Sequence, residues 1–339
     1  MIFYFLLLCA VICSSVCVSY AKDKGIVLIA KCITFNLFFI PAALRYGIGA
    51  DYFDYVKIFN GIPVGQFARI EVGWKWLNLA VYNLGGTAQA VIALTAFLSL
   101  FFLLCEVNRK KWFLYAPVCM IMIYMWLFTS LRQILAMSMV FCAMQRVQKK
   151  KYFVALLLAG GSYLFHKSSI MYIPIFLICY FAKCKPFFAA FIYFIVIIIT
   201  NFFSNYVNAY LFKLIGLGSY ANYLLTDWIN ATEPGIGRFI RYLVHGVMLF
   251  FFPLGTRNNA IYLNILFLYC VIDCYALNLQ IINRISRGLL FVFMPVIWAV
   301  WKTKKNRQFR VLVYIICFLL LFMRNYNGAE YISILNKMR

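Results

Sequence analysis

The chain opens with "MIFYFLLLCAVICSSVCVSYAKDK", residues 1–24, an apolar run that gives way to three charged residues. A helix needs about 20 apolar residues to cross the hydrocarbon core of a bilayer. The run ends in "SYA" like a secretory signal peptide, but it lacks the basic segment that precedes the apolar part of such a peptide. Positive charge after the first span predicts an N-terminus on the outside and a helix that is retained.

The same pattern recurs along all 339 residues, of which 65% are hydrophobic and only 12% charged. Soluble domains carry about 25% charged residues, so this composition cannot supply a water-exposed surface. The alternating strands of an outer-membrane barrel are absent. The sequence therefore predicts an all-α polytopic membrane protein with a single integral membrane domain over residues 1–339.

The net charge of +23 would indicate a nucleic-acid partner if the protein were soluble. Here many lysines and arginines lie in short gaps between apolar runs, where positive charge keeps a loop on the cytoplasmic side. We therefore expect membrane lipids, and no nucleic acid, as partners.

Six basic gaps determine the expected topology, because all six fit the cytoplasmic side if two spans separate each neighbouring pair. They are residues 22–24, 108–111, 145–151, 183–185, 256–259 and 302–310. About twelve spans follow, with both termini outside. The expected spans are 2–21, 26–44, 86–106, 112–128, 130–145, 152–166, 169–183, 186–204, 239–255, 260–277, 285–301 and 311–323.

Two outer loops, 45–85 and 205–238, are much longer than the rest and rich in aromatic residues. Within them, segments 71–83 and 206–225 have mixed polar and apolar faces. They are typical of short helices in the membrane interface, where Tyr and Trp rings are favoured. The inner loops are too short to fold, so we expect the activity on the outer face.

Eight arginines fall outside the inner loops, on the side where orientation rules disfavour them. An arginine at depth costs at least ~2.5 kcal/mol, so one that is retained usually faces the protein interior or a wet cavity. Its planar fork is well shaped to bind phosphate oxygens, although snorkelling to lipid headgroups is the alternative. The set predicts an outward-facing cavity that binds a diphosphate: Arg45, Arg69, Arg132, Arg238, Arg241, Arg284, Arg287 and Arg324.

The two histidines also fall among the outer polar residues. His166, in "LFHKSS", can accept a proton from a hydroxyl nucleophile as a neutral imidazole, or it can be a structural hydrogen-bonded residue. His245 follows Arg241 by four residues and shares a helical face with it, where it can orient that arginine.

Asp51, Asp54 and Glu71 are outer carboxylates. Asp51 and Asp54 are three residues apart, so in a helix they share a face and can act as base or metal ligands. The alternative is that they are counter-ions for Arg45 and Arg69. The twelve cysteines lie almost all in apolar runs, where a thiol behaves as a small hydrophobic side chain. No metal-ligand cluster of the usual spacing occurs, so we expect a metal-independent reaction without a cofactor.

Two Gly-Ile-Gly triplets, at Gly47–Gly49 and Gly235–Gly237, resemble the start of a nucleotide-binding loop. Neither continues to a third glycine, and neither lies between a strand and a helix, so the nucleotide interpretation fails. The glycines are better explained by a sharp turn at the end of a span, or by the close approach of a ligand.

The order of four polar motifs resembles that of the EpsG family of bacterial polysaccharide polymerases, relatives of the Wzy-type O-antigen and capsule polymerases. The motifs are "RYGIGADYFDY" at 45–55, "EVGWKWLN" at 71–78, "SLRQILAMSMVFCAM" at 130–144 and "FHKSSIMYIP" at 165–174. Recognisable motifs cover residues 1–185. The second half is similar only in topology and outer arginines.

The resemblance implies a GT-C-like glycosyltransferase of the bacterial inner membrane, with its active site facing the periplasm. Such an enzyme joins oligosaccharide repeat units carried on undecaprenyl diphosphate, and a chain-length regulator is an expected partner. The family's "RQ" arginine corresponds to Arg132, the "HKS" histidine to His166, and the first-loop motif to Arg45 and Asp51.

These correspondences complete the predicted site. Arg132 and Arg241 are the first candidates to bind the diphosphate, with Arg45, Arg238, Arg284 and Arg287 as further candidates. His166 is the candidate base, with Asp51 second, and loop 205–238 would cover the cleft.

Two other functions fit parts of the sequence. An O-antigen ligase shares the layout and the outer arginines, but the order of "RYGIGADY" and "RQ" favours the polymerase. A flippase or lipid-linked sugar transporter predicts two related halves and charges along both leaflets. This chain concentrates its long loops and unexplained charges on one side.

Overall fold

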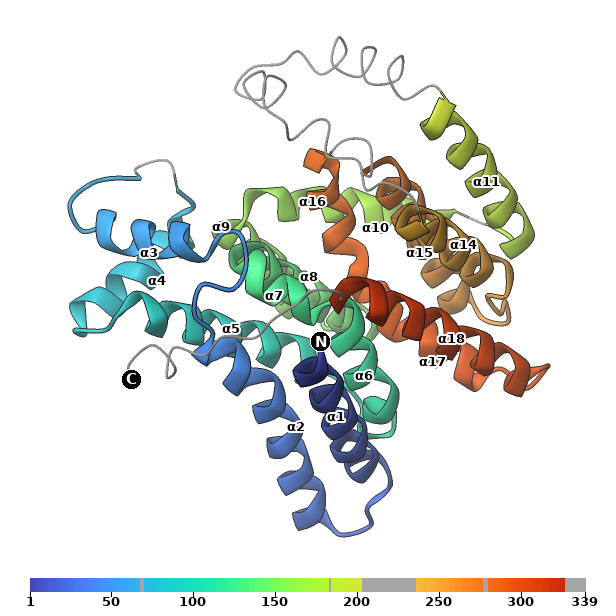
Figure 1. Cartoon of the computed structure of the whole chain (residues 1–339), viewed down its shortest axis with the longest axis horizontal. Helices are drawn as coiled ribbons and strands as arrows, with labels where there is room; N and C mark the ends of the chain where they lie inside the picture. The colour runs from blue at the N-terminus through green and yellow to red at the C-terminus, as the bar shows by residue number, and fades with distance from the viewer. Residues whose placement is uncertain (68–69, 183, 203–235, 277–279, 327–339) are drawn as a thin grey trace. The chain divides into compact units, whose positions relative to one another are not determined.

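The computed structural model describes residues 1–67, 70–182, 184–202, 236–276 and 280–326. Within these ranges the chain forms α- and 3₁₀-helices and no β-strand (Figure 1), which confirms the all-α prediction. The chain divides into two compact units. One comprises Met1–Pro174 with the segment that starts at Asn325, and the other is Ile175–Arg324.

The first unit contains most of the predicted motifs. Its helices are α1 (Ile2–Tyr20), α2 (Lys24–Leu44), α3 (Tyr52–Gly61), α4 (Val72–Asn83), α5 (Ala88–Leu104), η1 (Arg109–Lys111), α6 (Trp112–Met122), α7 (Tyr124–Thr129), α8 (Leu131–Gln148), α9 (Tyr152–Phe165) and η2 (Lys167–Met171). Helix α10 (Tyr172–Phe181) leads into the second unit.

The second unit continues with α11 (Pro186–Phe202), α14 (Ile236–Phe250), α15 (Arg257–Ala276), α16 (Gln280–Leu289), η3 (Leu290–Val292), α17 (Phe293–Lys302) and α18 (Arg307–Tyr326). Loop 205–238, apart from its last three residues, lies outside the described residues, as do the expected helix 206–225 and Arg69.

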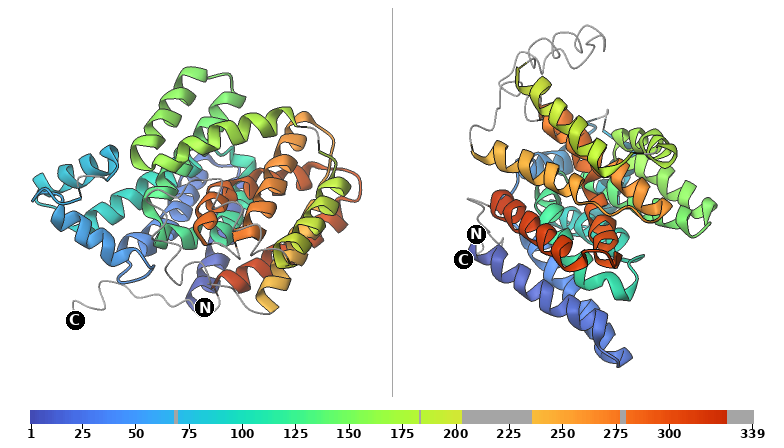
Figure 2. Two further views of the ribbon diagram at one scale, coloured as in Figure 1. Left: turned by 90° about the horizontal axis from the view of Figure 1, so that it is seen from above. Right: turned by 90° about the vertical axis from the view of Figure 1, so that its right-hand side faces the viewer.

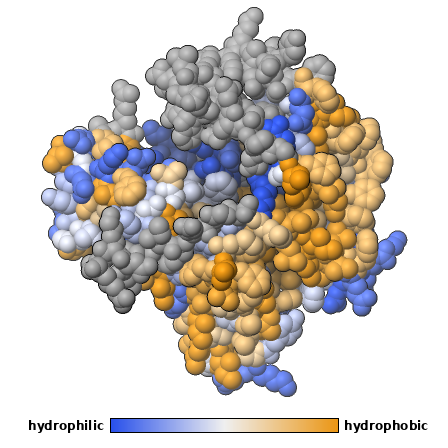
Figure 3. Space-filling model, viewed as in Figure 1, coloured by the Kyte–Doolittle hydropathy of each residue, from blue (hydrophilic) through white to orange (hydrophobic). Residues whose placement is uncertain are grey.

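Helices α1 and α2 form an antiparallel pair (Figures 1 and 2), as the opening sequence predicts. The charged gap between them caps α2, because the Asp23 carboxylate accepts a hydrogen bond from the Ile26 backbone N–H at 2.8 Å. Hydrophobic side chains such as Leu6 and Ile29 are exposed along the pair, and Figure 3 shows this apolar surface ending in hydrophilic residues at the gap. Such a surface suits lipid.

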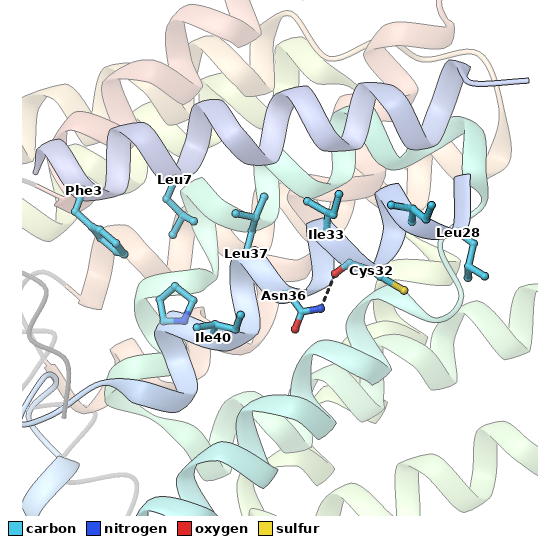
Figure 4. Close-up of a pocket in the computed structure, with 10 residues that line it drawn as sticks. Phe3, Leu7, Leu28, Cys32, Ile33, Asn36, Leu37 and Ile40 are labelled. Carbon is cyan, nitrogen blue, oxygen red and sulfur yellow. Dashed lines mark hydrogen bonds between the residues drawn. The ribbon is translucent and has the colours of Figure 1, made fainter. Parts of the chain in front are cut away.

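A groove of about 660 Å³ runs between these two helices (Figure 4). Leu7 of α1 and Leu37 of α2 are among the apolar side chains that line it. Asn36 also lines the groove, and its side-chain amide donates a hydrogen bond to the Cys32 carbonyl oxygen at 2.9 Å. The lining therefore offers hydrocarbon contacts rather than acid–base groups, and the polar chemistry lies elsewhere.

Five helical segments of the described chain are long and apolar enough to cross a membrane: α1, α2, α15, Ile282–Lys302 and α18. A sixth is possible if α5 and the segment Arg109–Met122, bent by 101°, count as one span. Helices occur in each of the twelve expected spans, but several are short, and the expected span 112–128 is broken at Ile123 into α6 and α7. The twelve-span count and the GT-C architecture thus stay predictions.

The turn after α2 carries the first motif. Gly47 and Gly49 have φ values of +64° and +93°, which confirms the predicted sharp turn. A Cβ atom on Gly49 would lie 2.1 Å from the Phe128 carbonyl oxygen, so only glycine fits there. The turn therefore lies against the end of α7, next to the start of α8.

Candidate active site

Glu71, the residue before α4, lies between two basic side chains of the first unit. Its Oε2 atom accepts a hydrogen bond from Arg132 Nη1 at 2.6 Å, and its Oε1 atom is 3.4 Å from His166 Nδ1. The side chains of Arg132, Glu71 and His166 are 27%, 12% and 17% exposed, so the group is sheltered yet reachable. We call these three residues the Glu71 cluster.

Three helices assemble this cluster from distant parts of the chain. Arg132 is the second residue of α8, and His166 directly follows α9. A Cβ atom on Gly73 would lie 2.9 Å from the Leu164 carbonyl oxygen, so glycine lets α4 approach the end of α9 closely. That approach places Glu71 beside His166. The structure also confirms the helix expected at 71–83, which is α4.

The electrostatics of the cluster keep Glu71 ionised. Partial burial alone would raise the pKa of its carboxyl, but the contact with His166 and the positive charge of Arg132 lower it to about 2. A carboxylate facing Nδ1 favours the imidazole tautomer that carries its proton there, which leaves Nε2 as the proton acceptor. A carboxylate and an imidazole are paired in the same way in sites where a third group orients a histidine.

Arg45, at the end of α2, is fully buried rather than exposed to a cavity. Its Nη1 donates to the Leu127 carbonyl oxygen at 2.5 Å, and its guanidinium lies 5.2 Å from the Phe128 ring centroid. Burial lowers the pKa of Arg45 to about 10, so the side chain stays charged at neutral pH. It therefore holds the C-terminal end of α7, where a cation is favoured.

Arg45 is not the partner of Asp51 or Asp54, and Arg69, the other arginine of that alternative, lies outside the described residues. Among the residues that the structure describes, no carboxylate lies within ion-pair distance of Arg45, and Asp54 pairs with Lys57 at 3.9 Å. Asp51 directly precedes α3, is partly exposed and does not cap that helix with its side chain. Its role as the second candidate base stays a prediction.

The second unit holds its own buried ion pair. Arg241 Nη1 of α14 lies 3.3 Å from Asp273 Oδ2 of α15, with both side chains less than a tenth exposed. One turn further along α14, His245 Nδ1 shares a hydrogen bond with the Tyr193 hydroxyl at 3.3 Å. Asp273 therefore orients Arg241, while His245 binds Tyr193 of α11.

Three further predicted arginines, Arg238, Arg284 and Arg287, also lie on helices of the second unit. Arg238, one turn before Arg241, donates to Asn201 Oδ1 at 3.2 Å. Arg284 and Arg287 lie one turn apart on α16, with Arg284 the more exposed. The structure thus brings Arg132 and His166 together on Glu71, and it places Arg238 with Arg241 on α14 and Arg284 with Arg287 on α16.

Sequence reasoning left two carboxylates out of the predicted site. Glu71 stands in the "EVGWKWLN" motif just before a helix, and that position was the signal for it. Asp273 stands alone in an apolar run, and an acid there usually has a buried partner. Both bind an arginine that had been predicted to bind diphosphate.

The helices and their lipid-facing surfaces define a polytopic helical membrane protein. The chain belongs to the EpsG family, whose family model matches residues 28–336, and this family is associated with polysaccharide polymerases. The match extends well beyond residues 1–185, so the second half also belongs to the part of the chain that the family model matches. The comparisons with curated proteins and with solved structures gave no match.

Proposed function

We propose that the protein is a polymerase that joins undecaprenyl-diphosphate-linked oligosaccharide repeat units into O-antigen or capsular polysaccharide. The reaction takes place at the periplasmic face of the bacterial inner membrane. Membership of the EpsG family supports the class of reaction. The observation that carries the proposal is the Glu71 cluster, where a candidate phosphate-binding arginine and a candidate base share one carboxylate.

The reaction is a glycosyl transfer with a diphosphate leaving group. A hydroxyl oxygen of the acceptor repeat unit attacks the anomeric carbon of the growing chain and forms the new glycosidic bond. The bond from that carbon to the diphosphate oxygen breaks, and undecaprenyl diphosphate leaves with the electron pair. The hydroxyl proton passes to the base. Catalysis therefore requires charge stabilisation on the leaving diphosphate and a proton acceptor at the hydroxyl.

The Glu71 cluster provides groups for both tasks. His166 takes the proton at Nε2, and Glu71 orients the ring through Nδ1. Arg132 has five N–H donors and uses Nη1 to donate a hydrogen bond to Glu71. Its other donors can bind phosphate oxygens. We assign the neutralisation of the diphosphate to arginine rather than to a metal ion. Asp51 is the second candidate for the base.

The other predicted arginines have graded roles in this proposal. Arg241 and Arg238 of α14, with Arg284 and Arg287 of α16, are assigned to the diphosphate or to the neighbouring sugars. Arg45 is buried against the end of α7, so its contribution is to hold the first-loop turn in place. A chain-length regulator is the expected protein partner.

Deletion of the gene tests the function. A polymerase mutant carries surface lipid with a single repeat unit, visible on a gel as core plus one unit, and the plasmid-borne gene restores the ladder. A ligase or flippase mutant carries core with no repeat unit, and that pattern would overturn the proposal. If Arg132→Ala and His166→Ala both leave long chains intact, the site assignment is wrong even when the deletion phenotype is correct.

A further inference from the structure

A cluster of thiols and a carboxylate lies in the first unit, apart from the residues assigned to glycosyl transfer. Cys105 follows the last residue of α5, Glu106 comes next in the chain, and Cys142 is on α8. One ligand atom of each, the two Sγ atoms and a carboxylate oxygen, lie within 4.8 Å of one another. We propose that these three residues bind a Zn²⁺ ion that joins the end of α5 to α8.

The spacing of the sulfur atoms matches zinc. Cys105 Sγ and Cys142 Sγ are 3.9 Å apart. Two thiolates at a Zn–S distance of about 2.3 Å on a tetrahedral ion are about 3.8 Å apart. A disulfide would instead require the sulfurs to close to about 2.0 Å, together with an oxidant. The zinc ion therefore fits with little movement of either helix.

Two basic side chains hold the carboxylate in place. Arg146 Nη2 contacts Glu106 Oε1, and Lys149 Nζ is 2.5 Å from Glu106 Oε2. Carboxylates that bind metals are commonly held by such outer hydrogen bonds, which leave lone pairs for the ion. The two cations also offset the negative charge of a Cys₂Glu ligand set.

The environment of the cluster suits a zinc site. The Cys142 side chain is buried and that of Cys105 is exposed, so the ion has a path to the ligands. The ion pair between Glu106 and Lys149 places the chain just before gap 108–111 beside gap 145–151. This agrees with the expectation that both gaps face the cytoplasm. Thiols stay reduced in that compartment. A water molecule takes the fourth coordination position.

Binding is not a redox step. Zn²⁺ forms two Zn–S bonds as the two S–H bonds break, and the two protons pass to the buffer. The count of protons therefore distinguishes this site from a surface carboxylate site, which binds Zn²⁺ and releases none.

The test is a Zn²⁺ titration of the full chain in detergent, purified under reducing conditions and stripped with a chelator. We expect one Zn²⁺ per chain and two protons released per ion. Cys105→Ser and Cys142→Ser abolish this binding, and Glu106→Gln weakens it at least about 10-fold. Cys13→Ser, which removes an exposed thiol on α1, is the matched control and binds like the wild type.

Titration with Cd²⁺ gives a second, spectroscopic readout that reports metal–sulfur bonds directly and does not depend on the stability of the folded protein. The thiolate-to-metal absorption band in the ultraviolet should appear in the wild type and be lost in Cys105→Ser and in Cys142→Ser. Absence of a saturable site, equal weakening by Cys13→Ser, or release of fewer than two protons would overturn the proposal. So would a Cys105–Cys142 disulfide in the reduced preparation.

Discussion

The Glu71 carboxylate contacts both Arg132 and His166, so the charges of these three side chains determine how a substrate can bind there. Arg132 and Glu71 neutralise each other through a single 2.6 Å contact, and His166 adds no charge when its imidazole is neutral. A diphosphate must therefore bind Arg132 while the Arg132–Glu71 ion pair stays intact. The five-donor fork allows this, because one N–H group can stay on Glu71 while others turn to the phosphates.

Removal of the Arg132 guanidinium should stop polymerisation. We expect Arg132→Ala to lower chain growth at least about 100-fold, as loss of an electrostatic donor at a leaving group does, and Arg132→Lys to restore only part of it. The polysaccharide ladder on a gel gives the measurement, with an immunoblot of the membrane fraction to verify insertion. Arg257→Ala, which removes an arginine packed 4.4 Å from the Tyr180 ring centroid, is the control and should keep the ladder.

The pKa of Glu71 predicts how the stability of the protein changes with pH. The folded value of about 2 lies below the usual 4.5, so ionised Glu71 stabilises the fold above about pH 4.5, and this contribution is lost as the pH falls towards 2. At pH 7, Glu71→Gln should lower the free energy of unfolding by roughly 1–2 kcal/mol. Thermal unfolding of both proteins in detergent should show this gap shrinking below pH 4.5. A gap that is constant down to pH 3 would contradict the assignment.

At the scale of elements, the position of α4 determines whether the Glu71 cluster exists. The helix approaches α9 through Gly73, and its Trp74 ring packs 5.5 Å from the Tyr55 ring centroid of α3. The segment 45–85 therefore contains a pair of helices, α3 and α4, and presents Glu71 to α8 and α9.

A single methyl group should disturb that contact. In Gly73→Ala the new Cβ lies 2.9 Å from the Leu164 carbonyl oxygen, so α4 must move away from α9 and carry Glu71 from His166. We expect roughly 1–3 kcal/mol of lost stability and a shorter ladder. Gly160→Ala is the control, because a Cβ there meets no atom within 4 Å. Equal ladders from the two variants would show that the approach of α4 does not matter.

Hydropathy and turn chemistry predicted many elements but not their partners. The pattern of apolar runs located α1, α2 and α15, and the two glycines of "RYGIG" predicted the turn that the structure contains. Glu71 is 61 residues from Arg132 in sequence, and Cys105 is 37 from Cys142. Periodicity reports which face of a helix is apolar, but it does not report which helix that face meets. The pairs that carry the chemistry were therefore not predictable in the same way.

At the scale of the whole molecule, the residues matched by the family model include both units. We therefore expect the second unit to contribute to the function as well. Its buried Arg241–Asp273 pair has two explanations, a structural ion pair and a prepared phosphate-binding arginine. Sequence alone supplied the arginine but not the acid, because a lone aspartate in an apolar run gives no indication of which of eight arginines it meets.

Paired substitutions separate these explanations. Asp273→Asn leaves the buried Arg241 charge poorly compensated and should lower the free energy of unfolding by about 3 kcal/mol, measured by thermal unfolding in detergent. The double variant Arg241→Met with Asp273→Leu should regain most of that stability. We expect it to fold and to make no ladder, as the binding role requires. A folded double variant with a full ladder would assign the pair to structure alone.

The buried guanidinium of Arg45 also sets an order of events during synthesis of the protein. Its hydrogen-bond acceptor, the Leu127 carbonyl, is 82 residues further along the chain, so it leaves the ribosome much later. Until then a charge at the end of α2 has nothing to replace its hydration, and water must keep it. The Arg45 guanidinium can therefore exchange its water shell for the Leu127 carbonyl only after α7 has emerged.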